Sequence, residues 1–125
     1  MSSVRMADQQ RSLCRLEDIP ENGGRGYTVS LPAAPRQVDI FIVRRGGTVR
    51  AYHNRCPHRG LNLDWVPDRF MDPAGEFLQC ANHDALFRVE DGYCVSGPCA
   101  GMRLRGVPVR VNERGEVELD ESGHA

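Results

Sequence analysis

Apolar residues occur along this chain in short runs and alternations, which is the pattern of β-strands rather than of helices. Residues 38–43 are apolar except for Asp39, and such a run is typical of a strand covered on both faces. Arg45-Gly46-Gly47 predicts a turn, and residues 48–52 predict the returning strand. The middle of the chain is therefore expected to form a β-hairpin.

The C-terminal half continues in the same way. Further short strands are expected at residues 77–80, 85–89, 93–95, 107–111 and 117–119. Asp91-Gly92 predicts a turn between two of them. Pro108 has no backbone N–H to donate, so its strand is expected at a sheet edge or at a strand start.

No segment has a sustained helical period with caps, so the predicted class is all-β, with an antiparallel barrel or sandwich as its base. The length of 125 residues fits one domain. We expect this domain to cover residues 11–120, with flexible tails at 1–10 and 121–125. Cys14 falls in an expected strand and is interpreted as a core residue.

One long stretch, residues 54–76, has weak strand character. A long irregular segment in a compact domain is usually functional. Within it, residues 70–77 with the turn 72–75 are interpreted as a hairpin. The stretch begins and ends beside two Cys/His pairs, which makes it the expected place of the chemistry.

The composition argues against nucleic-acid-binding, membrane-spanning and secreted disulfide-rich proteins. The net charge is −1, and the 16 basic residues, all Arg, are spread along the chain, so nucleic acid is not an expected partner. There is no apolar run of membrane-spanning length and no apolar signal-peptide segment. We expect a soluble, cytoplasmic protein without a membrane partner. Five cysteines, an odd number, argue against a secreted disulfide scaffold.

The two Cys/His pairs are the candidate metal ligands. Cys56 and His58 form the first pair, and Cys80 and His83 form the second. Thiolate and imidazole ligands suit iron–sulfur centres and zinc, so the residue types alone leave both open. Gly60, just after the first pair, allows the chain to curl back without a Cβ clash.

The spacing C-x-H…C-x-x-H resembles the Rieske [2Fe–2S] domain family, and the segment CPHRG at 56–60 is similar to the first cluster loop of its oxygenases and ferredoxins. The similarity also includes residues 13–20, the Tyr52 strand and Ser96-Gly97-Pro98. It covers most of the chain, residues 12–119.

The resemblance implies a cluster-binding part of two loops, over residues 54–99, and one [2Fe–2S] cluster per chain. Cys56 and Cys80 would bind a buried iron, and His58 and His83 would bind the iron nearer to solvent. Gly97 and Pro98 would cover the cluster from a third loop. Imidazole in place of thiolate raises the reduction potential into a range of about −150 to +300 mV.

The function implied is that of a one-electron carrier, a ferredoxin component that passes electrons from a reductase to an oxygenase or another redox enzyme. It would not be an enzyme by itself, because no further two-His, one-carboxylate iron site is expected after the cluster motifs. The alternatives are a small subunit of a larger redox complex of the nitrite-reductase kind, a structural Cys₂His₂ zinc site, and a redox sensor.

Three departures from the family pattern bear on this expectation. The 21 residues between His58 and Cys80 are more than the family usually has. The loop disulfide of respiratory members is absent, because Leu61 and Asn82 occupy its positions. Ala85 and Phe87 replace the hydroxyl residues that donate to the cluster in those members. We therefore predict a potential near the low end of the range of about −150 to +300 mV.

Other side chains near the motifs are interpreted as structural residues and not as cluster ligands. Cys94 and Cys99 could form a redox-sensitive disulfide, but we interpret both as small core residues. His53 is expected to be a half-exposed strand residue. Trp65 is expected to pack the cluster loop, although it could also serve in docking.

Overall fold

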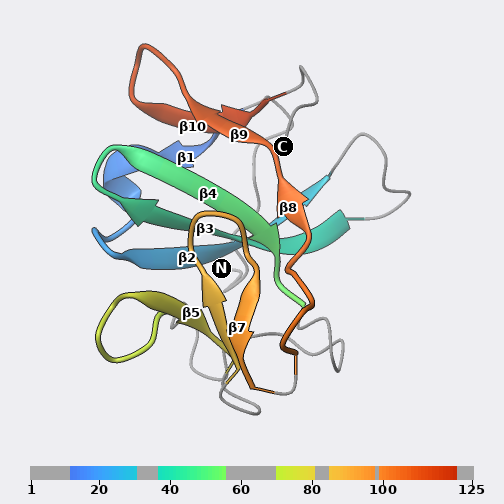
Figure 1. Cartoon of the computed structure of the whole chain (residues 1–125). Helices are drawn as coiled ribbons and strands as arrows, with labels where there is room; N and C mark the ends of the chain where they lie inside the picture. Colours follow the sequence, from blue (N-terminus) through green and yellow to red (C-terminus); the bar gives the residue numbers. More distant parts are fainter. Residues whose placement is uncertain (1–11, 31–36, 56–69, 81–84, 98, 121–125) are drawn as a thin grey trace, which may run out of the picture.

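The computed structural model describes residues 12–30, 37–55, 70–80, 85–97 and 99–120. These ranges form strands and one short 3₁₀ turn, so the predicted all-β class is confirmed (Figure 1). The elements, in chain order, are β1 (Ser12–Arg15), η1 (Leu16–Asp18), β2 (Gly23–Ser30), β3 (Gln37–Arg45), β4 (Thr48–His53), β5 (Phe77–Gln79), β6 (Leu86–Arg88), β7 (Cys94–Ser96), β8 (Gly106–Val107), β9 (Val109–Val111) and β10 (Glu116–Leu119).

The strands form three antiparallel sheets. Their orders are β2–β3–β4–β8, β1–β10–β9 and β5–β6–β7. Figure 1 shows the four-stranded sheet in the middle, with β9 and β10 above it and β5 and β7 below it. The first two sheets make the base of the molecule, and Cys80 directly follows a strand of the third.

The predicted central hairpin is confirmed. β3 and β4 pair from Ile40↔His53 to Arg45↔Thr48, and Gly46 in the connecting turn has a φ of +63°. Residues 40–43 are 0–1% exposed, as expected for a strand covered on both faces. The strand alternates between two hydrophobic cores and thereby joins the two parts of the molecule.

The core near the third sheet, here called the first core, contains four aromatic side chains, three of which form ring pairs. Phe41 and Phe70 stack with ring centroids 4.4 Å apart, and Tyr52 packs against Phe41 at 5.8 Å. The full set is Phe41, Val43, Tyr52, Phe70, Leu78, Cys80, Ala85, Phe87, Val89, Cys94, Cys99 and Leu104.

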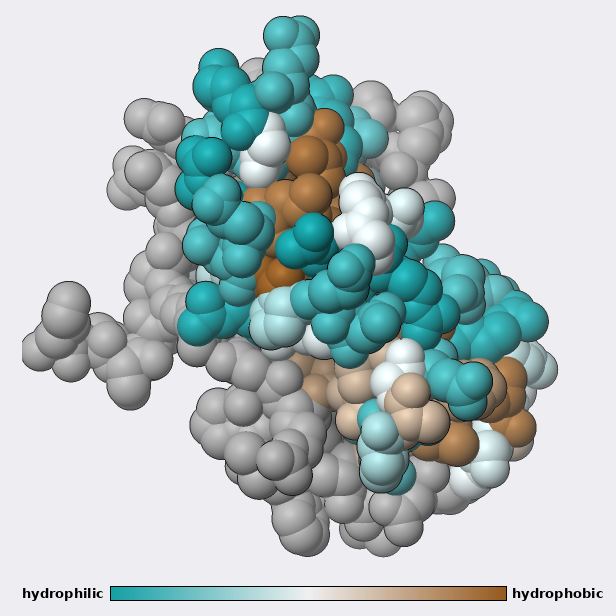
Figure 2. Space-filling model, turned by 90° about the vertical axis from the view of Figure 1, so that its left-hand side faces the viewer, coloured by the Kyte–Doolittle hydropathy of each residue, from teal (hydrophilic) through white to brown (hydrophobic). Residues whose placement is uncertain are grey.

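The second core lies in the base and is aliphatic apart from Tyr27. Its members are Leu13, Ile19, Tyr27, Val29, Ile40, Ile42, Val49, Ala51, Val107 and Val117. Cys14, which we expected in the core, is half-buried at its edge. Figure 2 shows two hydrophobic areas on one face of the molecule, with a hydrophilic band between them.

Strand β2 was not predicted, because three glycines and an arginine interrupt its apolar pattern. The structure gives a reason for one of these glycines. A Cβ on Gly24 would lie 2.9 Å from Val43 Cγ1 and 3.2 Å from a ring carbon of Phe70. Such distances are too short for a side chain, so Gly24 allows β2 to pass close to the first core.

The hairpin predicted at residues 70–77 is confirmed and continues to residue 79. Met71 bridges Leu78, and the Asp72 N–H donates to the Phe77 carbonyl over 2.8 Å. The Asp72 carboxylate also accepts from the backbone N–H of Glu76 and Phe77. The turn is therefore held by its own aspartate.

The C-terminal strands agree with the prediction for Pro108. β8 ends at Val107 on the edge of the four-stranded sheet, and β9 begins at Val109 on the edge of another. Pro108 thus lies where the chain passes from one sheet edge to the next, and no ladder needs its missing N–H.

Candidate metal centre

Of the four predicted ligands, Cys80 is the one within the described residues. It directly follows β5 and is fully buried in the first core. Cys56, His58 and His83 lie outside the described residues, as do Gly60, Trp65 and Pro98. The structure therefore places one proposed ligand directly after a short strand that pairs with β6.

The second motif is closed by backbone hydrogen bonds at both ends. Gln79 pairs with Leu86 in the β5–β6 ladder, and the Cys80 N–H donates to the Ala85 carbonyl over 2.9 Å. The chain thus leaves the sheet after Cys80 and returns at Ala85. His83 falls within these four intervening residues.

The chain is also anchored just before the first motif. β4 ends at His53, and the N–H of the buried Asn54 donates to the Asp39 carbonyl over 2.9 Å. Cys56 follows two residues later. The chain before the first motif is thus fixed to the central sheet as far as Asn54.

His53 is half-buried, as predicted. Burial, and secondarily the positive charge of Arg105, lower the pKa of its imidazole. The neutral form of His53 is therefore favoured at neutral pH. Its backbone N–H donates to the Arg105 carbonyl over 2.9 Å, which ties the end of β4 to the chain before β8.

The third loop approaches the second at Gly97. This residue has a φ of +96°, and a Cβ on it would lie 2.9 Å from Ala85 Cα. The glycine is thus required both for its backbone conformation and for the close approach. Gly97 was expected to lie near the cluster, and the structure places it against the residue that closes the Cys80 loop.

Three side chains of the base sheet hold the third sheet through backbone carbonyls. The Arg45 guanidinium donates to the carbonyls of Gly75 and Glu76 over 3.1 and 3.0 Å. Arg50 Nε donates to the Glu90 carbonyl over 3.2 Å. No local sequence pattern indicated this arrangement, because the partners are 30 to 40 residues apart.

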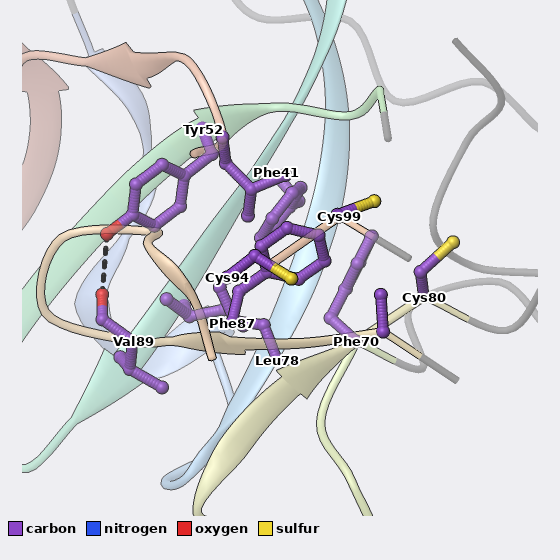
Figure 3. Close-up of a cluster of buried hydrophobic side chains, with 12 residues drawn as sticks. Phe41, Tyr52, Phe70, Leu78, Cys80, Phe87, Val89, Cys94 and Cys99 are labelled. Carbon is purple, nitrogen blue, oxygen red and sulfur yellow. Dashed lines mark hydrogen bonds between the residues drawn. The ribbon is translucent and has the colours of Figure 1, made fainter. Parts of the chain in front are cut away.

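The third of these side chains is Tyr52. Its hydroxyl donates to the Val89 carbonyl over 2.6 Å, and the contact is buried (Figure 3). Burial raises the pKa of the phenol to about 12. A Cβ on Gly92 would lie 2.8 Å from the Tyr52 ring, so the turn between β6 and β7 packs directly on this side chain.

The remaining described cysteines are not joined to one another. Cys94 and Cys99 are fully buried in the first core and form no disulfide with each other, which agrees with their interpretation as core residues. The Cys94 thiol donates to the Ser96 carbonyl over 3.2 Å. Cys14 shares a hydrogen bond with Tyr27, and burial raises the pKa of its thiol.

Within the described ranges, no three or more His, Cys, Asp or Glu side chains gather in a way that could hold a metal ion. A surface hollow of about 500 Å³ lies between β4, β8 and the 90–91 turn, and neither Cys nor His lines it. Among the residues described, no helix is long and apolar enough to cross a membrane. Cys80 is the one residue of the predicted ligand set that falls within the described ranges.

Comparisons with known proteins agree with these features. The family model of the Rieske [2Fe-2S] domain matches residues 9–111. The ferredoxin of carbazole 1,9a-dioxygenase from Nocardioides aromaticivorans IC177 has a TM-score of 0.67 and 21% identity, with 88% of this chain and 94% of that chain covered.

Two further solved structures are similar. A chain of the complex of reduced oxygenase and oxidised ferredoxin in carbazole 1,9a-dioxygenase has a TM-score of 0.64 and 25% identity, with 87% and 99% covered. A putative NADH-dependent nitrite reductase small subunit from Mycobacterium tuberculosis has a TM-score of 0.61 and 23% identity, with 86% and 90% covered. No curated protein matches the sequence.

Proposed function

The chain belongs to the Rieske [2Fe–2S] domain family, and from this premise we propose that it is a one-electron carrier. A Rieske-type [2Fe–2S] cluster is its cofactor. The observation that carries the proposal is the family match over residues 9–111, together with a fully buried thiol, Cys80, at the loop where the family binds its cluster.

The ligands proposed for the cluster are Cys56 and Cys80 on one iron and His58 and His83 on the other. The burial of Cys80 supports its place on the inner iron, since a buried thiolate is stabilised when it binds a cation. When bound, the cluster supplies a site that accepts and releases one electron. The protein's part is to hold the inner ligand rigidly, through the Cys80–Ala85 backbone hydrogen bond.

The partners proposed are a reductase that donates the electron and an oxygenase or another redox enzyme that accepts it. A similar chain is found in a complex of an oxygenase with a ferredoxin, which supports this choice. We propose that the chain itself catalyses no reaction. The cytoplasmic location expected from the sequence stays a prediction.

A second candidate is a small subunit of a larger redox complex. The similarity to a putative nitrite reductase small subunit favours it. The two candidates differ in assembly: a free carrier purifies alone with its cluster, whereas a subunit purifies with a large partner. Size-exclusion chromatography of the protein from its native host separates them.

The cluster is tested by EPR spectroscopy of dithionite-reduced protein purified without oxygen, with iron and sulfide measured on the same sample. We expect a signal of low average g and two irons and two sulfides per chain. Zinc in place of iron, with no EPR signal from protein made under conditions of cluster assembly, would support the structural zinc site and end the proposal.

The ligand set is tested by substitution. We expect His58→Ala and Cys80→Ala to abolish the intact cluster, because each removes an iron ligand. Cys94→Ser is the matched control for Cys80, since both thiols are fully buried in the first core. Loss of the visible absorption in Cys94→Ser as well would show that the ligand set is wrong.

A further inference from the structure

The surface hollow of about 500 Å³ lies where the chain passes from the four-stranded sheet to the β1–β10–β9 sheet. It is lined by residues 49–52 of β4, by residues 106–109, by the turn at 90–91 and by residues 103–104. Figure 1 shows β9 above β4 and the turn that leads into β7 below it. None of the lining residues is a proposed cluster ligand.

Two strand edges without a neighbouring strand border this hollow. β4 pairs with β3 along residues 48–53, but with β8 only at Ala51 and Tyr52. β8 then ends, and Pro108 leads the chain into β9, which is the last strand of its own sheet. Among the described strands, none therefore lies beside residues 48–50 on this side of β4 or beyond β9. Open edges of this kind can pair with an extended chain from another molecule.

Much of the lining is apolar. Val49, Ala51 and Val107 belong to the second core and are 3–6% exposed, and Leu104 belongs to the first core. Val109 is half-buried against the second core. An extended chain directs alternate side chains to the same face, so one set of side chains can contact this lining while the other set faces the charged rim.

The two carboxylates at the hollow are already paired. The Glu90 carboxylate lies 3.1 Å from the Arg45 guanidinium, and the Asp91 carboxylate accepts from Arg88 Nε over 3.0 Å. Both arginines lie outside the lining of the hollow. The negative charge at the rim is therefore largely neutralised by groups that do not face the hollow.

The two guanidinium groups at the hollow have no such carboxylate partner. Arg50 donates to backbone carbonyls, from Nε to Glu90 over 3.2 Å and from Nη1 to Val49 over 3.1 Å. Arg103 is exposed, and its charge acts on the Asp91 carboxylate, but it forms no salt bridge within the described part of the chain. The rim thus presents positive charge that is complementary to an acidic side chain.

We propose that this hollow is a docking site for an extended segment of a protein partner in which apolar and acidic side chains alternate. The segment pairs with the open edge of β4, its apolar side chains contact the lining around Val49 and Val109, and its carboxylates face Arg103. Strand addition of this kind takes affinity from main-chain hydrogen bonds and specificity from alternate side chains. The inference goes beyond the proposed function and does not depend on the place of the cluster.

The test is an NMR titration of the isotope-labelled whole chain with its cluster. The probe is a short blocked peptide of alternating glutamate and valine, and the control is the same peptide with lysine in place of glutamate. We expect the acidic peptide to shift the amide signals of Val49, Arg50 and Val109, and to bind several-fold more tightly than the basic peptide, because the unpaired charge at the rim is positive.

Two variants test the charge at the rim. Arg103→Gln should weaken binding of the acidic peptide about two- to fivefold, the usual effect of one exposed ion pair. Arg105→Gln is the matched control, because Arg105 is also exposed and removes the same charge when substituted, but does not line the hollow. We expect it to weaken binding less.

A modified peptide tests the strand edge. Methylation of the peptide's backbone nitrogens keeps its charges and its valines but removes the main-chain donors, so we expect it to abolish binding. Full binding of the methylated peptide, equal binding of the acidic and basic peptides, or equal losses in the two arginine variants would overturn the inference. So would an acidic peptide that shifts no amide signals at the hollow. A missing Rieske EPR signal would refute the proposed function alone, since these titrations measure binding at the sheet edge.

Discussion

Two glycines with similar positive φ values lie in different surroundings. Gly97 and Gly101 both have positive φ values, +96° and +90°. A Cβ on Gly97 would meet Ala85, whereas a Cβ on Gly101 would meet nothing within 4 Å. The pair therefore separates the cost of backbone strain from the cost of a steric clash between two loops.

This difference gives the first prediction. Gly101→Ala should destabilise the protein by about 1–2 kcal/mol, the cost of a left-handed conformation for a residue with a Cβ. Gly97→Ala should cost more, because the third loop must also move away from Ala85. Chemical denaturation of the two variants measures the difference. Equal losses would mean that the two loops do not touch at this point.

The Tyr52 hydroxyl gives a second prediction at the scale of one residue. Tyr52→Phe leaves the buried Val89 carbonyl without its donor, which should cost about 1–3 kcal/mol. Tyr93→Phe is the control, since Tyr93 is half-buried and its ring lies under the Arg88 guanidinium. Denaturant unfolding should show a clearly larger loss for Tyr52→Phe; equal losses would contradict the buried hydrogen bond.

At the scale of elements, the link between the base sheet and the turn before β5 depends on one guanidinium. Arg45 reaches two carbonyls of that turn and also pairs with the Glu90 carboxylate at 3.1 Å. A planar guanidinium has several donors in fixed directions, whereas an ammonium is a single point of charge. The contact therefore depends on the shape of the side chain as well as on its charge.

Arg45→Lys should therefore destabilise the protein by about 1 kcal/mol, although the positive charge is retained. The amides of residues 75–77 should exchange faster with deuterium, because the turn loses two donors. Arg15→Lys is the control: its guanidinium pairs with Glu17 at 3.4 Å on the exposed surface. Its effect should stay within about 0.5 kcal/mol. No change in exchange in Arg45→Lys would show that the contact does not hold the turn.

Elements with a clear apolar pattern could be predicted from the sequence, and the others could not. Residues 38–43 and 48–52 carry β-branched and aromatic side chains, and they form the central hairpin. β2 has glycines where the prediction requires apolar side chains, because a neighbouring side chain fills that space. Packing of this kind involves residues far apart in sequence, so no local pattern indicates it.

The candidate metal centre, too, could be predicted only in part from the sequence. The spacing of the Cys/His pairs indicated the cofactor, and the family match confirms it. The packing of Gly97 against Ala85 could not be predicted, because it depends on how closely two loops approach each other. The assignment of all four ligands stays a prediction, since three of them lie outside the described residues.

At the scale of the whole molecule, the two cores share the β3–β4 hairpin. Tyr52 lies in this hairpin, and burial raises the pKa of its phenol from 10 to about 12. Burial raises the pKa of Tyr27, in the second core, as well. Both cores therefore contain a phenol whose protonated form is favoured by burial.

The pH dependence of stability follows from these two shifts. The unfolded chain loses the Tyr52 proton near pH 10, while the folded chain keeps it until about pH 12. The folded state binds more protons in this window, so stability falls as the pH rises from 10 to 12. Unfolding by denaturant between pH 8 and pH 11.5 measures the fall, and Tyr52→Phe should reduce its slope. A slope unchanged in the variant would assign the effect to other groups.

The links between the base and the third sheet have one further property: their acceptors are mostly main-chain carbonyls. Any amino acid supplies a carbonyl, so the turns at 74–76 and 89–90 can change their side chains over evolution without losing the link. Arg45, Arg50 and Tyr52, by contrast, donate through their side chains, so a residue without such a donor at any of these positions would lose the hydrogen bond. Among diverging descendants of this chain, the base should therefore keep these three side chains while the turns that they hold drift.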